Sequence, residues 1–325
     1  MGRIAPGGVA GMASRATPLA ISVVLVATLA GCIFSSPTPA PSADASGAIP
    51  TVGPPSPGAS PSAGPSASPI VTPEPSIPAV ATKPTPCPGS NRNPGAAPGR
   101  QYSGGSTNWA GYVSAVKKTG VTCVEGSWIE PSVTCPKSGR QAVAIWIGID
   151  GFAGAVGIPS TDVLVQIGTQ VTCTNGVAEH GAWHEILPGE AHEVPIAARI
   201  RAGDHMSARI SYANNRFTLV LYDQDAEGLF SLTAPAPGAP RKTAEWIVEA
   251  PATDCPGSCA PLPLPKFTTV RFTGAYATIA GQRSSINDAS WSNVKLTMTR
   301  SRITRASVSI LASGGSAFRV FWKHS

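Results

Sequence analysis

The C-terminal two thirds of the sequence predict an all-β domain, either a sandwich or a barrel. Short apolar runs recur there, and many of them alternate apolar with polar residues. Gly, Pro, Asn and Asp break these runs at short intervals, and no stretch carries a convincing 3.6-residue period. Many short strands separated by regular turn signals are typical of sandwiches and barrels.

The expected strands follow one another along this region with turn signals between them. Two of the clearest turns are Ala202-Gly203-Asp204 and Ala213-Asn214-Asn215, where small and polar residues favour a change of chain direction. The clearest strands are residues 142–149, 163–167, 217–222, 270–275 and 294–298.

Proline is concentrated in front of this domain. The chain has 325 residues and 33 Pro, and residues 33 to about 100 are almost all Pro, Ser, Ala, Gly and Thr. Such a segment cannot bury enough apolar surface to offset its ordering entropy. We therefore expect residues 32–105 to be a disordered tether and residues 106–325 to be one domain with one core. As a polyproline II helix, at about 3.1 Å per residue, the tether would reach on the order of 200 Å.

The N-terminus has the layout of an export signal. Arg3 and Arg15 precede an apolar run, residues 18–31, which is too short to span a bilayer. The run ends in Leu29-Ala30-Gly31-Cys32, which resembles the lipobox of bacterial lipoproteins. We expect residues 1–31 to be a lipoprotein-type signal peptide, with a lipid on Cys32 that anchors the protein to the outer face of a bacterial membrane. The alternative is an ordinary signal peptide followed by a chance Cys.

Six further Cys residues predict three disulfides, because an exported chain meets an oxidising compartment. Cys255 and Cys259 suggest a small local loop. We favour Cys135 with Cys173, which leaves Cys87 with Cys123. A zinc site is the competing interpretation, but no paired CxxC motif supports it.

The charge of the chain favours a solvated basic surface over a nucleic-acid interface. The formal net charge is +6, from 24 Lys and Arg against 18 Asp and Glu, and the basic residues are scattered without interleaved aromatic residues. We expect no nucleic-acid partner, and nothing in the sequence demands an assembly, so a monomer is expected. The few carboxylates also permit an acid habitat, since acid denaturation mostly protonates paired carboxylates.

Strand alternation places several polar side chains away from the core. In residues 163–168, Gln166 faces opposite to the valines. In residues 244–249, Glu249 faces opposite to Trp246, so both polar residues should project from the concave or solvent side of a sheet, away from the core. Trp183 and Glu185 point together on another strand.

Several known chemistries find little support. The domain has no G-x-S-x-G elbow and no H-E-x-x-H motif. His180 and His184 share a strand face and could bind a metal together with His192. Glu185 and Glu249 could also serve as the two carboxylates of a glycosidase.

Six segments, taken in order, resemble the glutamic peptidases, also called eqolisins. The similarity extends over nearly all of residues 106–325. The segments are Asn108–Tyr112, Gly126–Pro131, Ile145–Gly151, Leu164–Gly168, Ala182–Pro188 and Ala244–Glu249.

This resemblance implies a two-sheet antiparallel β-sandwich of the concanavalin-like jelly-roll type, without a cofactor or a metal. It also implies a catalytic pair at Gln166 and Glu249, acting on a polypeptide substrate. Trp146, Asp150 and Glu185 fall at positions that line or support the family's cleft, and Trp183 lies beside Glu185.

The residue types fit peptide hydrolysis in acid. An ionised Glu249, with an ordinary pKa of about 4.3, would accept a proton from the attacking water and pass it to the leaving amine. The amide of Gln166 would orient the water and stabilise the oxyanion. The alternative function is a non-catalytic carbohydrate- or peptide-binding module on the same sandwich.

Three departures from the fungal members leave the pH optimum and the substrate preference open. Ala250 replaces an Asp after the catalytic Glu, His180-Gly181 replaces Tyr-Asp, and His184 replaces a Tyr. Fungal members are also made with a propeptide, and the sequence does not decide whether the Pro-rich segment acts as one.

Overall fold

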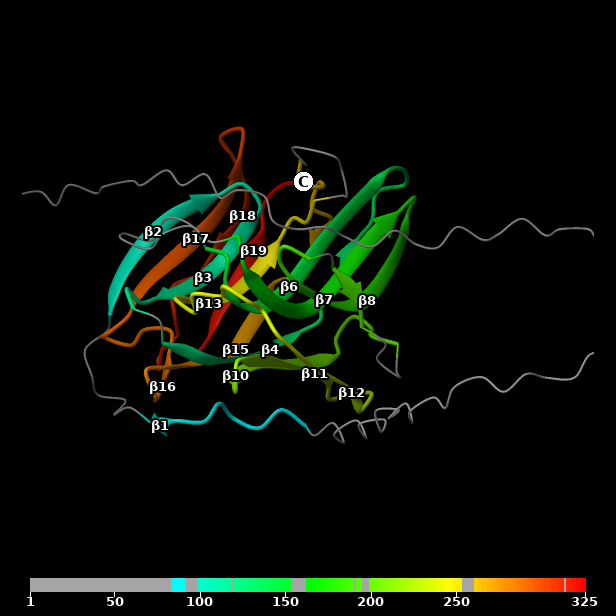
Figure 1. The fold of residues 1–325 in the computed structure, drawn as a ribbon. Coiled ribbons are helices and arrows are strands. Elements are labelled where there is room, and N and C mark those ends of the chain that lie inside the picture. The colour runs from blue at the N-terminus through cyan, green and yellow to red at the C-terminus, as the bar shows by residue number, and fades with distance from the viewer. Residues whose placement is uncertain are drawn as a thin grey trace, which may run out of the picture.

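The computed structural model describes residues 83–91, 99–118, 120–152, 162–189, 191–194, 199–252, 260–312 and 314–325. These residues form β-strands, turns and extended segments, and none of them is helical. The strands build two layers that face each other (Figure 1). The predicted all-β sandwich is therefore confirmed. The described part also contains no helix that could cross a membrane.

The first layer, sheet A, carries the residues of interest. Its strand order is β2-β17-β3-β13-β6-β7-β8-β9, and its neighbours are antiparallel except for the parallel pair of β17 with β2. The bounds are β2 Arg100–Ser106, β3 Trp109–Ala115, β6 Arg140–Asp150, β7 Leu164–Thr174, β8 Val177–Ile186, β9 His192–Glu193, β13 Thr243–Glu249 and β17 Ser292–Arg300.

The second layer, sheet B, has the order β1-β16-β15-β4-β10-β11-β12, with one parallel pair between β1 and β16. Strands β18 and β19 connect the layers, since β18 pairs with β17 and β19 pairs with β15. The remaining bounds are β1 Ser90–Asn91, β4 Val121–Ile129, β5 Val133–Thr134, β10 His205–Ala213, β11 Arg216–Asp223, β12 Gly228–Ala234, β14 Lys266–Phe267, β15 Val270–Ile279, β16 Gln282–Ser285, β18 Ile303–Val308 and β19 Phe318–Trp322.

The main core lies between the two layers, and the alternation of the strands builds it. Ile167 and Trp246 from sheet A pack in the same cluster as Trp128 and Phe217 from sheet B. Burial of each such side chain stabilises the fold by roughly 1.5–3 kcal/mol. The opposite side of sheet A, here called the outer face, carries a second and smaller cluster of buried aromatic and aliphatic residues.

All five of the clearest expected strands are present, as parts of β6, β7, β11, β15 and β17, although β7 begins at Leu164, one residue after the expected start. The largest difference in length is at β7, which continues seven residues beyond the expected end at Ile167. The continuation is polar, and it is held by backbone pairing with β6 and β8 on both sides. Ladder hydrogen bonds of this kind depend on neighbours that are distant in sequence, so the local apolar pattern did not reveal them.

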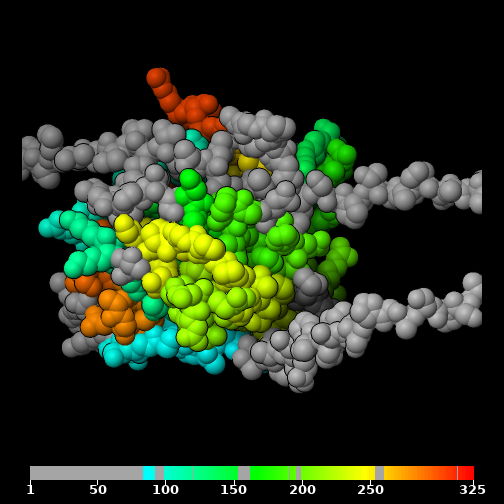
Figure 2. Space-filling view, in the orientation of Figure 1, coloured from blue at the N-terminus to red at the C-terminus, as the bar shows by residue number. Residues whose placement is uncertain are grey.

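The folded part begins before residue 106, which corrects the expected tether boundary. Residues 100–106 form β2, which pairs with β17 over seven residues. Residues 83–91 cross sheet B from β11 to β16, since Lys83 lies over the ring of Tyr222, Cys87 is bonded to Cys123 of β4, and β1 pairs with β16 (Figures 1 and 2). The Pro-rich composition did not predict this order, because these segments are held by strand pairing and a disulfide and not by burial in the core. The expected signal peptide, Cys32 and the rest of the tether lie outside the described residues.

Two of the three expected disulfides are present. Cys87 is bonded to Cys123, and Cys135 is bonded to Cys173. The first bond fixes the N-terminal segment to β4, where Thr85 also accepts hydrogen bonds from Arg209. The expected bond between Cys255 and Cys259 lies outside the described residues.

Candidate active site

The predicted pair lies on the outer face of sheet A, opposite the main core. Cross-strand pairing defines three neighbouring rows of residues there, and one residue of each row comes from each of β13, β6, β7 and β8. Gln166 is in the first row and Glu249 in the third, so the pair is separated by one strand and offset by four residues. The rows are Glu245–Gly148–Gln166–Glu185, Ile247–Trp146–Gly168–Trp183 and Glu249–Ala144–Gln170–Gly181.

The pair lies on the face away from the main core, as the strand alternation predicted, and both side chains are buried there. Gln166 is 1% exposed and Glu249 is 2% exposed. The aromatic residues of the outer face account for part of this burial, because Trp109, Trp146 and Trp183 belong to the cluster on this side of the sheet. A sequence pattern tells which face a side chain takes but not what covers that face.

Glu249 is held by two donors. The indole Nε1 of Trp146 donates to Oε2 at 2.8 Å, and the amide Nδ2 of Asn108 donates to Oε1 at 3.0 Å. Asn108 directly precedes β3, which pairs with β13 so that Trp109 lies opposite Glu249. Both oxygens of the carboxyl are therefore fixed by neighbouring strands.

Burial raises the pKa of Glu249 to about 8. The indoles of Trp146 and Trp109 lower the pKa and Glu185 raises it, but these effects are smaller than that of burial. We expected an ionised Glu249 with an ordinary pKa. The structure instead favours a Glu249 that keeps its proton throughout the acid range, because a carboxylate loses its hydration at this position.

Gln166 is oriented by Glu185. Its Nε2 donates to Oε2 of Glu185 at 2.5 Å, across the pairing of β7 with β8. The other end of the amide, Oε1, is buried and accepts no hydrogen bond from the described residues. The amide therefore presents a free acceptor and one remaining N–H on the outer face.

Trp146 lies between the two members of the pair. Its ring meets Trp109 edge-on, with 5.0 Å between the ring centroids. Gly168 is its neighbour on β7, where an added Cβ would lie 2.1 Å from the carbonyl oxygen of Ile145 and 2.6 Å from Cβ of Trp146. The glycine of this strand thus allows β6 and β7 to approach closely behind the tryptophan.

The other two predicted supporting residues hold the backbone of the site. Asp150 is buried, and its oxygens accept hydrogen bonds from the backbone N–H groups of Arg241 at 2.7 Å and Lys242 at 2.8 Å. Asp150 therefore ties the end of β6 to the start of β13. Trp183 donates its indole N–H to the carbonyl oxygen of Thr169 at 3.2 Å.

Sequence reasoning did not assign two residues of this face. Asn108 stood in the first of the six segments, but only the structure shows that it donates to Glu249. Glu245 lies on the same face of β13 as Glu249. Both of its oxygens are buried and have no hydrogen-bond partner among the described residues, and burial raises its pKa well above the ordinary range.

The positions of His180, His184 and His192 do not support the alternative hypothesis of a metal site. His180 Nδ1 lies 2.9 Å from Oε1 of Glu130. His184 stacks on Phe230 and lies against His192, with 5.3 Å between the two imidazole rings. Among the described residues, the three histidines do not form a group of three close ligand atoms.

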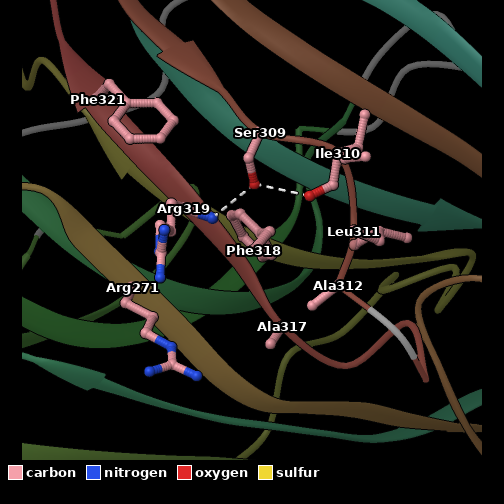
Figure 3. A pocket seen from close by; sticks show the side chains of 9 residues that line it. All are labelled: Arg271, Ser309, Ile310, Leu311, Ala312, Ala317, Phe318, Arg319 and Phe321. Carbon is pink, nitrogen blue, oxygen red and sulfur yellow. Dashed lines mark hydrogen bonds between the residues drawn. The ribbon is translucent and has the colours of Figure 1, made fainter.

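A cavity of about 460 Å³ lies elsewhere, between β15, β19 and the segment after β18, and it includes none of the predicted residues (Figure 3). Ser309 closes one side of it through hydrogen bonds with the backbone of Ile310 and Arg319. Arg271 and Arg319 lie opposite each other on neighbouring strands of its wall.

Comparison with known proteins agrees with this geometry. Residues 107–315 match the peptidase A4 family. The chain belongs to the peptidase A4 family. It is thus a peptide hydrolase of the glutamic type, and the resemblance seen in its six segments is confirmed.

Solved structures agree with the fold of this A4 peptidase. A crystal structure of scytalido-glutamic peptidase with a transition state analog inhibitor has a TM-score of 0.56 and 19% sequence identity, and the match covers 67% of this chain and 98% of that one. SCP-B, a member of the eqolisin family in a complex with the tripeptide Ala-Ile-His, has a TM-score of 0.53 and 18% identity over 67% and 98% of the two chains. No curated protein matches the sequence.

Proposed function

We propose that this A4 peptidase hydrolyses internal peptide bonds of polypeptides in acid, with Glu249 and Gln166 as its catalytic pair. The observation that carries the proposal is the state of Glu249. Its carboxyl is buried, held by Trp146 and Asn108, and has a pKa raised to about 8, so it holds a transferable proton throughout the acid range. A general acid must be protonated at the working pH, and this one is.

The proton of Glu249 supports both halves of the reaction. In the first half, Glu249 donates its proton to the scissile carbonyl oxygen while water attacks the carbonyl carbon. The carboxylate formed in this way accepts a proton from the attacking water, which leaves a neutral gem-diol and a protonated Glu249. In this cycle Glu249 activates the water only after it has served as the acid.

The second half releases the products by the reverse sequence of proton transfers. Glu249 donates its proton to the leaving nitrogen, and the C–N bond breaks. Its carboxylate then accepts a proton from one hydroxyl of the gem-diol. The products are a carboxylic acid and an amine, and Glu249 is again protonated.

Gln166 serves the same step from the other side of Trp146. Its free Oε1 accepts a hydrogen bond from the attacking water, and the N–H that is not bound to Glu185 donates to the scissile carbonyl oxygen while Glu249 protonates that oxygen. Glu185 fixes which end of the amide faces which partner. An amide does not ionise, so this arrangement persists across the acid range.

A proteolysis assay with matched variants tests the proposal. The full-length chain would be incubated with a denatured protein between pH 2 and pH 8, beside Glu249→Gln, Gln166→Ala and the control Glu179→Gln on the exposed part of β8. We expect both site variants to lose activity and the control to keep it. Hydrolysis that survives both site variants would overturn the catalytic pair, and peptide binding without hydrolysis in the parent protein would favour a binding module.

We also propose that the protein is exported and anchored by a lipid on Cys32, with the domain as a monomer outside the cell. The lipobox-like residues before Cys32 and the Pro-rich segment after it support this location. Membrane fractionation of Cys32→Ala is the test, and a variant that remains in the membrane fraction would contradict the anchor. Light scattering of the released domain would measure its oligomeric state.

A further inference from the structure

Three carboxylates meet at one end of sheet B, on elements that take no part in the catalytic pair. Asp204 directly precedes β10, Asp223 is the last residue of β11, and Asp225 lies in the turn that follows. Strands β10 and β11 are antiparallel with Met206 opposite Asp223, so their ends bring the three side chains together. One carboxylate oxygen of each residue lies within 4.8 Å of those of the other two.

The protein fixes one oxygen of each carboxylate with N–H groups. Asp223 Oδ1 accepts from the backbone of Asp225 at 3.0 Å and of Ala226 at 3.1 Å. Asp204 Oδ2 accepts from the backbone of Arg201 at 2.6 Å, and Asp225 Oδ2 accepts from the backbone of His205 at 2.5 Å. Within the described residues the second oxygen of each carboxylate accepts no hydrogen bond, so the orientation of the three groups is set while three oxygens stay available.

Asp223 is the member of the cluster whose unpaired oxygen most clearly points to a bound ligand. Its side chain is fully buried, and its Oδ2 has no hydrogen-bond partner in the described part of the chain. Burial raises its pKa, and the nearby charges of Asp204 and Asp225 raise it further. A buried carboxylate oxygen without a partner is costly unless a proton or a cation neutralises it.

The chain itself supplies little positive charge here. The formal net charge of the protein is +6, yet no Lys or Arg of the described residues forms an ion pair with any of the three carboxylates. His205 contacts the cluster with its Nδ1 at 3.0 Å from Oδ2 of Asp225, and both of these groups are about half exposed. Asp223, the buried member, is left without a counter-charge.

We propose that Asp204, Asp223 and Asp225 bind a divalent cation of the size of Ca²⁺. Ca²⁺ takes oxygen ligands at about 2.3–2.6 Å, so two oxygens on opposite sides of it lie about 5 Å apart, which suits the spacing of these groups. Three carboxylates and several waters complete its usual coordination number of about 6–8. The ion would join the loop before β10 to the turn between β11 and β12.

Titration of the full-length chain with CaCl₂ at pH 7.5 tests the site, read by calorimetry and by thermal unfolding. We expect one saturable site with a Kd of about 10⁻⁴–10⁻³ M, as in other extracellular calcium modules, and a rise in Tm of several degrees at 10 mM CaCl₂. NaCl at matched ionic strength should leave the Tm unchanged. MgCl₂ should shift it less than CaCl₂, because Mg²⁺ requires shorter bonds and loses its waters reluctantly.

Variants assign the binding to these side chains. Asp204→Asn and Asp225→Asn should each weaken the binding of Ca²⁺ at least tenfold, since each removes one carboxylate from an exposed or half-buried position without disturbing the core. Asp162→Asn, which removes the same charge from an exposed position outside the cluster, is the matched control and should bind as the parent does. Absence of a calcium-dependent heat and Tm shift, an equal shift in NaCl, or unchanged binding in both cluster variants would overturn the proposal.

Discussion

Buried glutamates lie against both sides of sheet A, and they differ in whether a basic side chain contacts them. On the inner side Glu130 faces His180 Nδ1 at 2.9 Å and accepts a hydrogen bond from Thr169 Oγ1 at 2.6 Å. In sheet B, Glu125 is paired with Arg283 and accepts a hydrogen bond from the backbone N–H of Cys87. These groups bring a basic partner with them.

On the outer face, Glu249 and Glu245 form no ion pair with any described residue, and burial raises the pKa of both. The presence or absence of a basic partner thus separates carboxyls with a structural role from those available for proton transfer. A carboxyl with a basic partner links two segments of the fold through that contact. Burial without a counter-charge destabilises the ionised carboxylate, so the carboxyl keeps its proton and can donate it in a reaction.

Glu249→Gln removes the unpaired carboxyl of the outer face, and we expect it to have the largest effect on activity. The substitution keeps the shape and removes the transferable proton, so kcat should fall by about 10³–10⁴-fold, in the range of general acid–base catalysis. The Tm at pH 7 should change little, because the loss of a costly buried acid offsets the loss of one of the two accepting oxygens to an amide NH2. Peptide hydrolysis and thermal unfolding measure the two, and a variant that unfolds while keeping its specific activity would reverse the assignment.

Glu130→Ala should have the opposite outcome. Loss of this carboxyl leaves His180 and Thr169 without their partner, which typically costs about 3–5 kcal/mol for a buried pair. A domain of this size then loses about 10 °C in Tm. The value of kcat below the new Tm should stay within a few-fold of the parent. Glu179→Ala, on the same strand as His180 but exposed, is the control, and an equal loss in both would argue against the pair.

The pH dependence of thermal stability tests whether Glu249 has a raised pKa in the folded protein. The unfolded chain releases the proton of Glu249 above its ordinary pKa of 4.5, whereas the folded protein keeps it up to a pKa of about 8. The folded state therefore binds more protons between these values, so the unfolding free energy falls as the pH rises through this window. Tm should be several degrees lower at pH 8 than at pH 5. Glu249→Gln should flatten this slope, and an unchanged slope would contradict the raised pKa.

Trp146→Phe is the smallest and most specific test. It keeps an aromatic ring and removes the N–H that donates to the protonated Glu249, a hydrogen bond of about 0.5–1.5 kcal/mol, so kcat should fall by up to about tenfold. The indole lowers the pKa of Glu249, and its loss should move the alkaline limb of the kcat/KM profile to higher pH. A merely structural tryptophan would lower activity without moving that limb.

Much of this molecule follows from the sequence because strands carry a period of two. The pattern in residues 163–168 and 244–249 placed Gln166 and Glu249 on the face opposite Ile167 and Trp246, and the structure has them there. Two disulfides and the five clearest strands were also expected correctly. Six ordered segments indicated the family, since together they extend over nearly the whole domain.

Only the tertiary structure decided the chemistry of these groups. The donors to Glu249 are Asn108, directly before β3, and Trp146 of β6, which lie 141 and 103 residues away along the chain, and no local pattern fixes such contacts. Burial on the outer face raises the pKa of Glu249 above the ordinary value that the sequence led us to expect. The sequence determines which face a side chain takes, because that depends on adjacent residues. Its protonation depends on water and charge around it, which distant strands supply.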